Sequence, residues 1–134
     1  LLFDELVFVV AVNKEKNSLF NNDERVNLIE ECITNFNNVR VGSFDGLVVE
    51  YAKTEKAIAI IRGLRHVSDF EFEFQMAMMN YNLNPMITSM FMMPDEKYIH
   101  LNSTVIKDVA KFGGDISDYV PDNVKIALYK KYKD

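Results

Sequence analysis

Residues 57–65 read AIAIIRGLR, an unbroken apolar run that gives way to two arginines separated by a glycine and a leucine. An apolar run of this length, bounded by charge and glycine, is typical of a buried strand. We therefore predict a strand over residues 57–61 that the arginine-containing segment breaks. The patterns on either side of this strand determine the fold.

Strand-like and helical patterns alternate on both sides of this run. Apolar, β-branched patterning predicts further strands over residues 5–13, 39–43 and 87–93. Apolar spacing and capping residues predict helices over residues 21–36, 46–55, 68–83, 103–112 and 121–131. Strands that alternate with helices need crossover connections, which make the strands parallel and place helices on both faces of the sheet. The sequence thus predicts an α/β fold with a parallel sheet.

Helical spacing also predicts which side chains face the core. In the helix over residues 68–83 these are aromatic or small, and we expect them to be core rather than a cofactor platform: Phe70, Phe74, Ala77 and Tyr81. The two preceding helices have similar inward sets, which are Val26, Ile29, Ile33 and Phe36, and then Leu47, Val48, Tyr51 and Ala52. Gly113 and Gly114 are expected to end the helix that begins at Ser103.

Composition narrows the class of protein. The chain has 134 residues, of which 49% are hydrophobic and 26% charged, and we expect one globular domain. A net charge of −5 argues against a general nucleic-acid coat, although a few local cations can still bind a small anion. No apolar run is long enough to span a membrane. The single cysteine, Cys32, favours a reducing, cytoplasmic compartment.

Ligands of parallel α/β sheets bind outside the carboxyl ends of the strands. That rule directs attention to residues 13–20, 44–48, 62–69 and 94–104. In the third segment, Arg62 and Arg65 flank Gly63 and Leu64, a combination that suits a phosphate chain. Two surface arginines, paired with acidic residues such as Asp69 or Glu71 on the following helix, explain the segment equally well.

The other segments carry weaker signals. Lys14 and Lys16 follow the first strand and could contact phosphate, but the segment by itself favours solvated lysines. Asn102, Ser103 and Thr104 open a helix, where hydroxyl and free N–H groups can bind an anion, although a purely structural cap is the commoner case.

Resident metal chemistry and covalent catalysis receive no support from the sequence. His66 and His100 are isolated, and no Cys/His cluster occurs. We expect Cys32 to be a small buried filler on a helix rather than a nucleophile. The common glycine-rich nucleotide motifs are absent. The residues alone predict an α/β domain that binds phosphates, with no reaction named.

Four motifs follow one another in the middle of the chain: IRGLR at residues 61–65, VSDFEFE at 67–73, QMA at 75–77 and MN at 79–80. With these motifs the chain resembles the bacterial phosphopantetheine adenylyltransferases. Shorter matches extend the resemblance over the whole chain: Phe20 with ERV at 24–26, MP at 93–94, Ser103-Thr104 with Lys107, GDI at 114–116, VP at 120–121 and NV at 123–124.

This resemblance implies a Rossmann-like nucleotidyltransferase fold and a specific reaction. Members transfer the adenylyl group of ATP to 4'-phosphopantetheine by direct in-line attack, giving dephospho-coenzyme A and pyrophosphate. They are usually homo-hexamers that work with magnesium. Sister nucleotidyltransferases act on nicotinamide mononucleotide or, with CTP, on glycerol phosphate, and a non-catalytic nucleotide-binding module is a further alternative.

The resemblance also assigns site residues, with Lys16 and Arg65 in catalytic roles. The phosphopantetheine site is Lys16, Val48 and Arg62. The ATP site is Gly63, Leu64, Arg65, Glu73, Tyr98, Ile99, His100, Leu101, Asn102, Ser103 and Thr104. Asn102 departs from the family, which usually has serine there, but an amide can still donate a hydrogen bond.

One family feature has no counterpart in these residues. The family's first strand, its glycine-rich turn and its T-x-G-H histidine match nothing here, and the chain starts with Leu1 rather than methionine. We expect that segment to precede Leu1 in the native protein. We also expect the portion from Leu1 onward to be inactive in isolation, because the histidine stabilises the transition state in the family.

Overall fold

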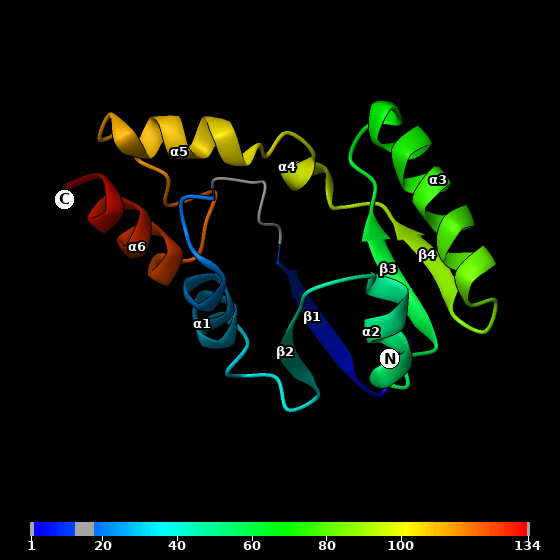
Figure 1. The fold of residues 1–134 in the computed structure, drawn as a ribbon. Coiled ribbons are helices and arrows are strands. Elements are labelled where there is room, and N and C mark those ends of the chain that lie inside the picture. The colour runs from blue at the N-terminus through cyan, green and yellow to red at the C-terminus, as the bar shows by residue number, and fades with distance from the viewer. Residues whose placement is uncertain (1, 13–17, 134) are drawn as a thin grey trace. The chain divides into compact units, whose positions relative to one another are not determined.

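A computed structural model describes residues 2–12 and 18–133, in which strands and helices alternate along the chain (Figure 1). The elements are β1 (Leu6–Ala11), α1 (Asn22–Cys32), β2 (Val39–Phe44), α2 (Val48–Thr54), β3 (Ala59–Gly63), α3 (Val67–Leu83), β4 (Thr88–Met92), α4 (Glu96–Ile99), α5 (Ser103–Lys111) and α6 (Asp122–Lys133). β1 pairs with β2 and β3 pairs with β4, both in parallel. The predicted α/β class and parallel strand direction are confirmed.

The described strands form two two-stranded sheets, one in each of two compact units. Unit 1 contains the chain up to Asp45 and the chain from Leu101 onward, and unit 2 is Gly46–His100. Each sheet is a β-α-β crossover, since α1 connects β1 to β2 and α3 connects β3 to β4. Alternation predicts parallel direction through the crossover rule, but it does not predict which strands pair.

Unit 1 has its core around α5 and α6. Ala110, Ile116 and Leu128 are its most buried members, and Ile106 and Val124 pack against them. α5 ends in a Schellman motif, in which the Gly113 N–H donates to the Ala110 carbonyl and the Gly114 N–H to the Val109 carbonyl. Gly113 has a positive φ of 77°, which explains why the predicted glycine pair stops this helix.

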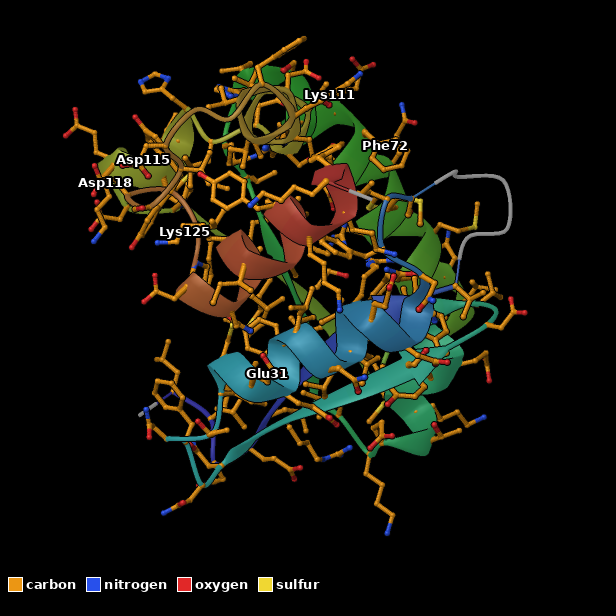
Figure 2. All side chains as sticks on the ribbon, turned by 90° about the vertical axis from the view of Figure 1, so that its left-hand side faces the viewer. Glu31, Phe72, Lys111, Asp115, Asp118 and Lys125 are labelled. Carbon is orange, nitrogen blue, oxygen red and sulfur yellow. The ribbon has the colours of Figure 1, made fainter. Side chains whose placement is uncertain are left out.

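Polar contacts attach α6 to its neighbours within unit 1. The Lys125 ammonium donates to the Ser117 hydroxyl at 3.1 Å, and that hydroxyl donates to Asp115 at 2.6 Å, at the turn labelled in Figure 2. The Ser117 hydroxyl and the Ser117 N–H both donate to Asp115, and these hydrogen bonds hold the pKa of Asp115 below its usual range. Asn123 donates to Glu31 on α1 at 3.0 Å. α6 is thus attached both to the turn that contains Asp115 and to α1.

Unit 2 has a smaller core between α2 and the β3–β4 sheet. Val49, Ala52, Ile60 and Ile87 form it, with Val48 and Ala57 packed against them. α3 lies against β4, where the Phe70 ring meets the Phe91 ring with centroids 6.4 Å apart. Helices therefore flank this sheet as the sequence predicts.

Several details of the prediction are wrong. Arg62 and Gly63 do not break β3. Their backbones pair with Phe91 and Met92 of β4, and this pairing does not depend on apolar side chains. α4 was not expected at all. α1 ends at Cys32, so Phe36 lies beyond it and is 58% exposed. Cys32 itself is exposed rather than buried, because it lies in the last turn of a helix that has no buried residues. Leu47 is exposed because it caps α2 instead of lying within it, and Val49 is buried in its place.

The largest departure is in α3. The predicted aromatic face is half exposed, at 48% for both Phe70 and Phe74 and 58% for Tyr81. The less exposed side of α3 consists of Asp69, Glu73, Ala77 and Asn80, which we call the inward stripe. Phe72, labelled in Figure 2, lies outside this stripe and is 61% exposed. The helix thus turns acidic and amide groups toward its own unit.

Candidate functional site

Arg62 lies at the carboxyl end of β3 and makes a two-point ion pair with α3. Its Nε and Nη2 atoms each donate to one oxygen of Glu73, both at 2.7 Å. The Glu73 side chain is 11% exposed, whereas that of Arg62 is 51% exposed. The hydrogen bonds to Glu73 raise the pKa of the Arg62 guanidinium. One edge of the guanidinium is therefore fixed against the helix while the side chain still reaches solvent.

The local fold explains why this pair forms. Arg62 is the register partner of Phe91 on β4, and the Phe91 ring contacts Phe70 on α3. Phe70 stacks on Phe74 with centroids 5.7 Å apart, one helical turn along. These aromatic contacts hold α3 over this end of the sheet, which brings Glu73 to Arg62.

Arg65 follows in the loop between β3 and α3. The Leu64 N–H donates to the Met92 carbonyl at 2.9 Å, so the loop stays attached to β4 one residue beyond the strand. The Arg65 Nε lies 3.6 Å from an Asp69 oxygen, one helical turn before Glu73. The two arginines thus face two carboxylates of the same inward stripe, at the strand end where α/β sheets bind ligands.

The remaining predicted residues of unit 2 lie on α2 and α4. Val48 begins α2 and packs against the Val49 cluster. Tyr98 and Ile99 belong to α4, and His100 caps its end. Asp95 caps the start of α4 by accepting from the Lys97 N–H at 3.1 Å. The hydrogen bond to Tyr98 raises the pKa of Lys97, whose ammonium lies 4.6 Å from that ring.

The other predicted residues belong to unit 1. Leu101 to Thr104 lead into α5, and the Asn102 Oδ1 accepts from the Thr104 N–H at 2.8 Å. Asn102 therefore makes the structural cap that the sequence had left open as an alternative to anion binding. Lys16, with its neighbour Lys14, lies outside the described residues.

The structure brings together Arg62 and Glu73 directly, and it places Arg65, Gly63 and Leu64 at the same strand end. The sequence had proposed Asp69 or Glu71 as arginine partners, and the structure selects Asp69 for Arg65 and Glu73 for Arg62. The sequence spacing could have predicted these partners, because Asp69 and Glu73 are four residues apart and therefore share one helix face.

Other features lie elsewhere. Two shallow hollows open beside α6. One of about 400 Å³ is lined by α6 residues such as Ile126 and Lys130, and one of about 430 Å³ lies between α1 and α6, with Phe20 in its lining. None of the predicted site residues that the structure describes lines them. Residues 2–12 and 18–133 contain no group of three or more His, Cys, Asp or Glu side chains that could hold a metal ion. Over those same residues, no helix has the length and apolarity needed to cross a membrane.

Chemically, the end of β3 can bind an anion. Five N–H donors of a guanidinium suit two-point recognition of carboxylate or phosphate, and Arg62 already shows that mode with Glu73. Neither a serine nor a cysteine nucleophile accompanies these arginines within the inward stripe or the 62–65 segment. The arrangement favours positioning and charge stabilisation over covalent catalysis.

Comparison with known proteins identifies close relatives. A family model described as cytidylyltransferase-like matches residues 2–109. A phosphopantetheine adenylyltransferase of Caldanaerobacter subterraneus subsp. tengcongensis is 49% identical over 132 residues, covering 98% of this chain and 82% of that protein. The enzyme of that name from Opitutus terrae is 50% identical over 127 residues, covering 95% and 79%, and that from Methylococcus capsulatus is 48% identical over 131 residues, covering 98% and 81%.

Proposed function

The chain belongs to the phosphopantetheine adenylyltransferase family, and we propose that it transfers the adenylyl group of ATP to 4'-phosphopantetheine. The products are dephospho-coenzyme A and pyrophosphate. The observation that carries the proposal is the pair of arginines, Arg62 and Arg65, at the carboxyl end of β3 within the IRGLR segment. Arg62 keeps half of its side chain exposed there for a ligand.

The reaction requires two polyanions to meet. The acceptor phosphate attacks the α-phosphorus of ATP in line, so the new P–O bond forms as the bond to pyrophosphate breaks. Unit charges about 4 Å apart interact by roughly 4 kcal/mol at an effective dielectric of about 20. Arginine cations offset that repulsion, and correct placement of both reactants contributes roughly 7–11 kcal/mol. No covalent enzyme intermediate is needed.

Individual roles follow the family pattern and the described contacts. We assign Lys16, Val48 and Arg62 to the phosphopantetheine site, and Lys16 and Arg65 to stabilising the transferring phosphoryl group. The ATP site comprises Gly63, Leu64, Arg65, Glu73, Tyr98, Ile99, His100, Leu101, Asn102, Ser103 and Thr104. The Asn102 Oδ1 is engaged as a helix cap, which leaves its Nδ2 as the donor for a nucleotide.

Magnesium enters this proposal with ATP. Magnesium is usually bound through one or two carboxylates, several waters and substrate phosphates. The carboxylates beside the arginines, Glu73 and Asp69, face Arg62 and Arg65. This donor set fits a magnesium ion carried on the triphosphate, where it supplies charge neutralisation, better than an all-protein cage.

A homo-hexamer and a cytoplasmic location complete the proposal. Exposed apolar side chains of α3, including Phe72, Met78 and Met79, support self-association because such surface is unfavourable in water. The chain has a single cysteine, Cys32, and therefore no pair for an internal disulfide, which favours a reducing compartment.

The test is a comparison of acceptors. Full-length protein is assayed for pyrophosphate release with ATP and 4'-phosphopantetheine, with ATP and nicotinamide mononucleotide, and with CTP and glycerol phosphate. We expect turnover with 4'-phosphopantetheine alone and dephospho-coenzyme A as the product. Preferred turnover with another acceptor would place the protein among the sister nucleotidyltransferases, and nucleotide binding without turnover would make it a non-catalytic module.

A further inference from the structure

The ion pair between Arg62 and Glu73 defines how the arginine can meet a ligand. A guanidinium has five N–H donors in a planar fork. The bonds to Glu73 use the Nε–H and one Nη2–H, both at 2.7 Å. Three donors remain, two on Nη1 and one on Nη2. One N–H of Nη1 and the free N–H of Nη2 lie parallel at the tip of the guanidinium, where they can donate to two oxygens of one phosphate.

Glu73 is better placed to hold Arg62 than to contact a nucleotide. Its side chain is 11% exposed, and both of its oxygens accept from the arginine. A carboxylate that faced a triphosphate directly would repel it. Paired with Arg62, its charge is balanced, and the more exposed partner is the cation.

Fixing one edge of Arg62 also lowers the entropy cost of binding. A half-exposed arginine samples many rotamers, and a ligand that selects one of them loses affinity. The two-point bond to α3 selects that rotamer beforehand. Phe70, which stacks on Phe74 and contacts Phe91 of β4, helps to hold the helix that carries Glu73.

We propose that Glu73 is a positioning residue, which acts on the site through Arg62 by aiming the end of its guanidinium at the phosphate of the acceptor. The inference rests on the proposed function, which supplies that acceptor. It gives Glu73 a role on the phosphopantetheine side of the reaction, in place of the direct ATP contact that the family pattern assigns to it, because both of its oxygens are engaged by Arg62.

The test measures the affinity of full-length protein for 4'-phosphopantetheine and, separately, for ATP by titration calorimetry. Glu73→Gln keeps the shape of the side chain but offers one oxygen, so one of the two bonds is lost. We expect roughly tenfold weaker acceptor binding, as for loss of a charged hydrogen bond, and ATP binding within about twofold. Glu71→Gln, on the exposed side of the same helix, is the matched control and should change neither affinity.

A double variant separates positioning from direct contact. In an Arg62→Ala background, Glu73→Gln should cause no further loss of acceptor affinity, because Glu73 acts through the arginine. An additive loss would overturn the proposal, as would weaker ATP binding with unchanged acceptor binding. Loss of the folded circular dichroism spectrum in Glu73→Gln would instead make Glu73 a structural residue.

The same data distinguish failure of the two proposals. A wild-type protein that binds no 4'-phosphopantetheine refutes the proposed acceptor before any variant is compared, and the positioning role falls with it. Wild type and Glu73→Gln that bind it equally well refute the positioning role alone.

Discussion

The helices α6 and α3 bury opposite kinds of side chain. In α6, Val124, Leu128 and Tyr132 recur at helical spacing and pack into the core of unit 1. In α3, the inward stripe is acidic or amide at three of its four positions, and the aromatic and methionine side chains are 39–61% exposed, including Phe70, whose ring contacts Phe91 on β4. α6 follows the ordinary amphipathic rule, and α3 inverts it.

The difference separates a helix that builds the fold from one that serves a site. Polar groups on an inward face cost stability unless they have partners, and Glu73 and Asp69 have theirs in Arg62 and Arg65. Local conflicts between pattern and burial are expected where function requires them. The polar inward face of α3 is therefore explained by its ion pairs with the two arginines at the end of β3.

The largest expected effect is on catalysis, when Arg65 is replaced. Arg65→Ala should lower kcat/KM by about 100-fold or more, as for loss of one donor to a developing charge. Its 3.6 Å ion pair with Asp69 is partly exposed, so stability should change by no more than about 1 kcal/mol. Steady-state kinetics and thermal unfolding measure the two. A rate within a few-fold of wild type would show that the site assignment is wrong.

On the other side of the comparison, substitutions in unit 1 should affect folding rather than turnover. Ile116 is fully buried against α6, and Ile116→Ala should lower the free energy of unfolding by about 2–5 kcal/mol. Ile126→Ala is the matched control, because Ile126 lies on α6 but is 65% exposed. Urea unfolding monitored by circular dichroism gives both values. An equal loss of unfolding free energy in Ile116→Ala and Ile126→Ala would contradict this prediction.

The outward face of α3 gives a test of assembly. Phe72 on α3 and Ile126 on α6 are exposed to similar extents, 61% and 65%. If the apolar face of α3 is covered by another subunit, Phe72→Asp buries a charge there and should lower the mass measured by light scattering. Ile126→Asp should leave the mass unchanged. The same mass for both variants would exclude α3 from the interface.

The smallest effect is a pH dependence on α6. Lys131 contacts Glu24 on α1 at 2.7 Å and, with the Asn21 N–H, holds the pKa of Glu24 below its ordinary value of 4.5. A lowered pKa stabilises the folded state above pH 4.5, and this contribution is lost as the pH falls through the lower, folded-state pKa.

Glu24→Gln should therefore lower Tm at neutral pH and flatten the loss of Tm on acidification to about pH 3. Thermal unfolding across this range is the measurement, with Glu30→Gln, an exposed position on the same helix, as the control. An unchanged acid slope in Glu24→Gln would mean that the pair contributes nothing.

Much of the fold follows from the sequence, because its rules are local. Apolar runs mark the strands, the crossover rule makes them parallel, and Gly113 stops α5 through its positive φ. Pairing within two separate sheets does not follow, since periodicity says nothing of which strands are neighbours.

The candidate site was predictable as a set of positions but not as a set of contacts. The arginines after the predicted strand of residues 57–61 suited phosphate binding and surface ion pairs equally well, and the structure places Arg62 among the last residues of the strand itself, at the carboxyl end of β3. The Arg62–Glu73 bond was missed because hydrophobic spacing favoured Phe70 and Phe74 as the inward face of α3.

The most direct test of the account measures what the acceptor phosphate contributes to binding. Titration calorimetry compares 4'-phosphopantetheine with pantetheine, which lacks the phosphate, on wild-type protein and on Arg62→Ala. We predict that the phosphate strengthens binding to the wild type by about 10- to 100-fold, and by a clearly smaller factor to the variant, which keeps Lys16. The same phosphate contribution in both proteins would contradict it.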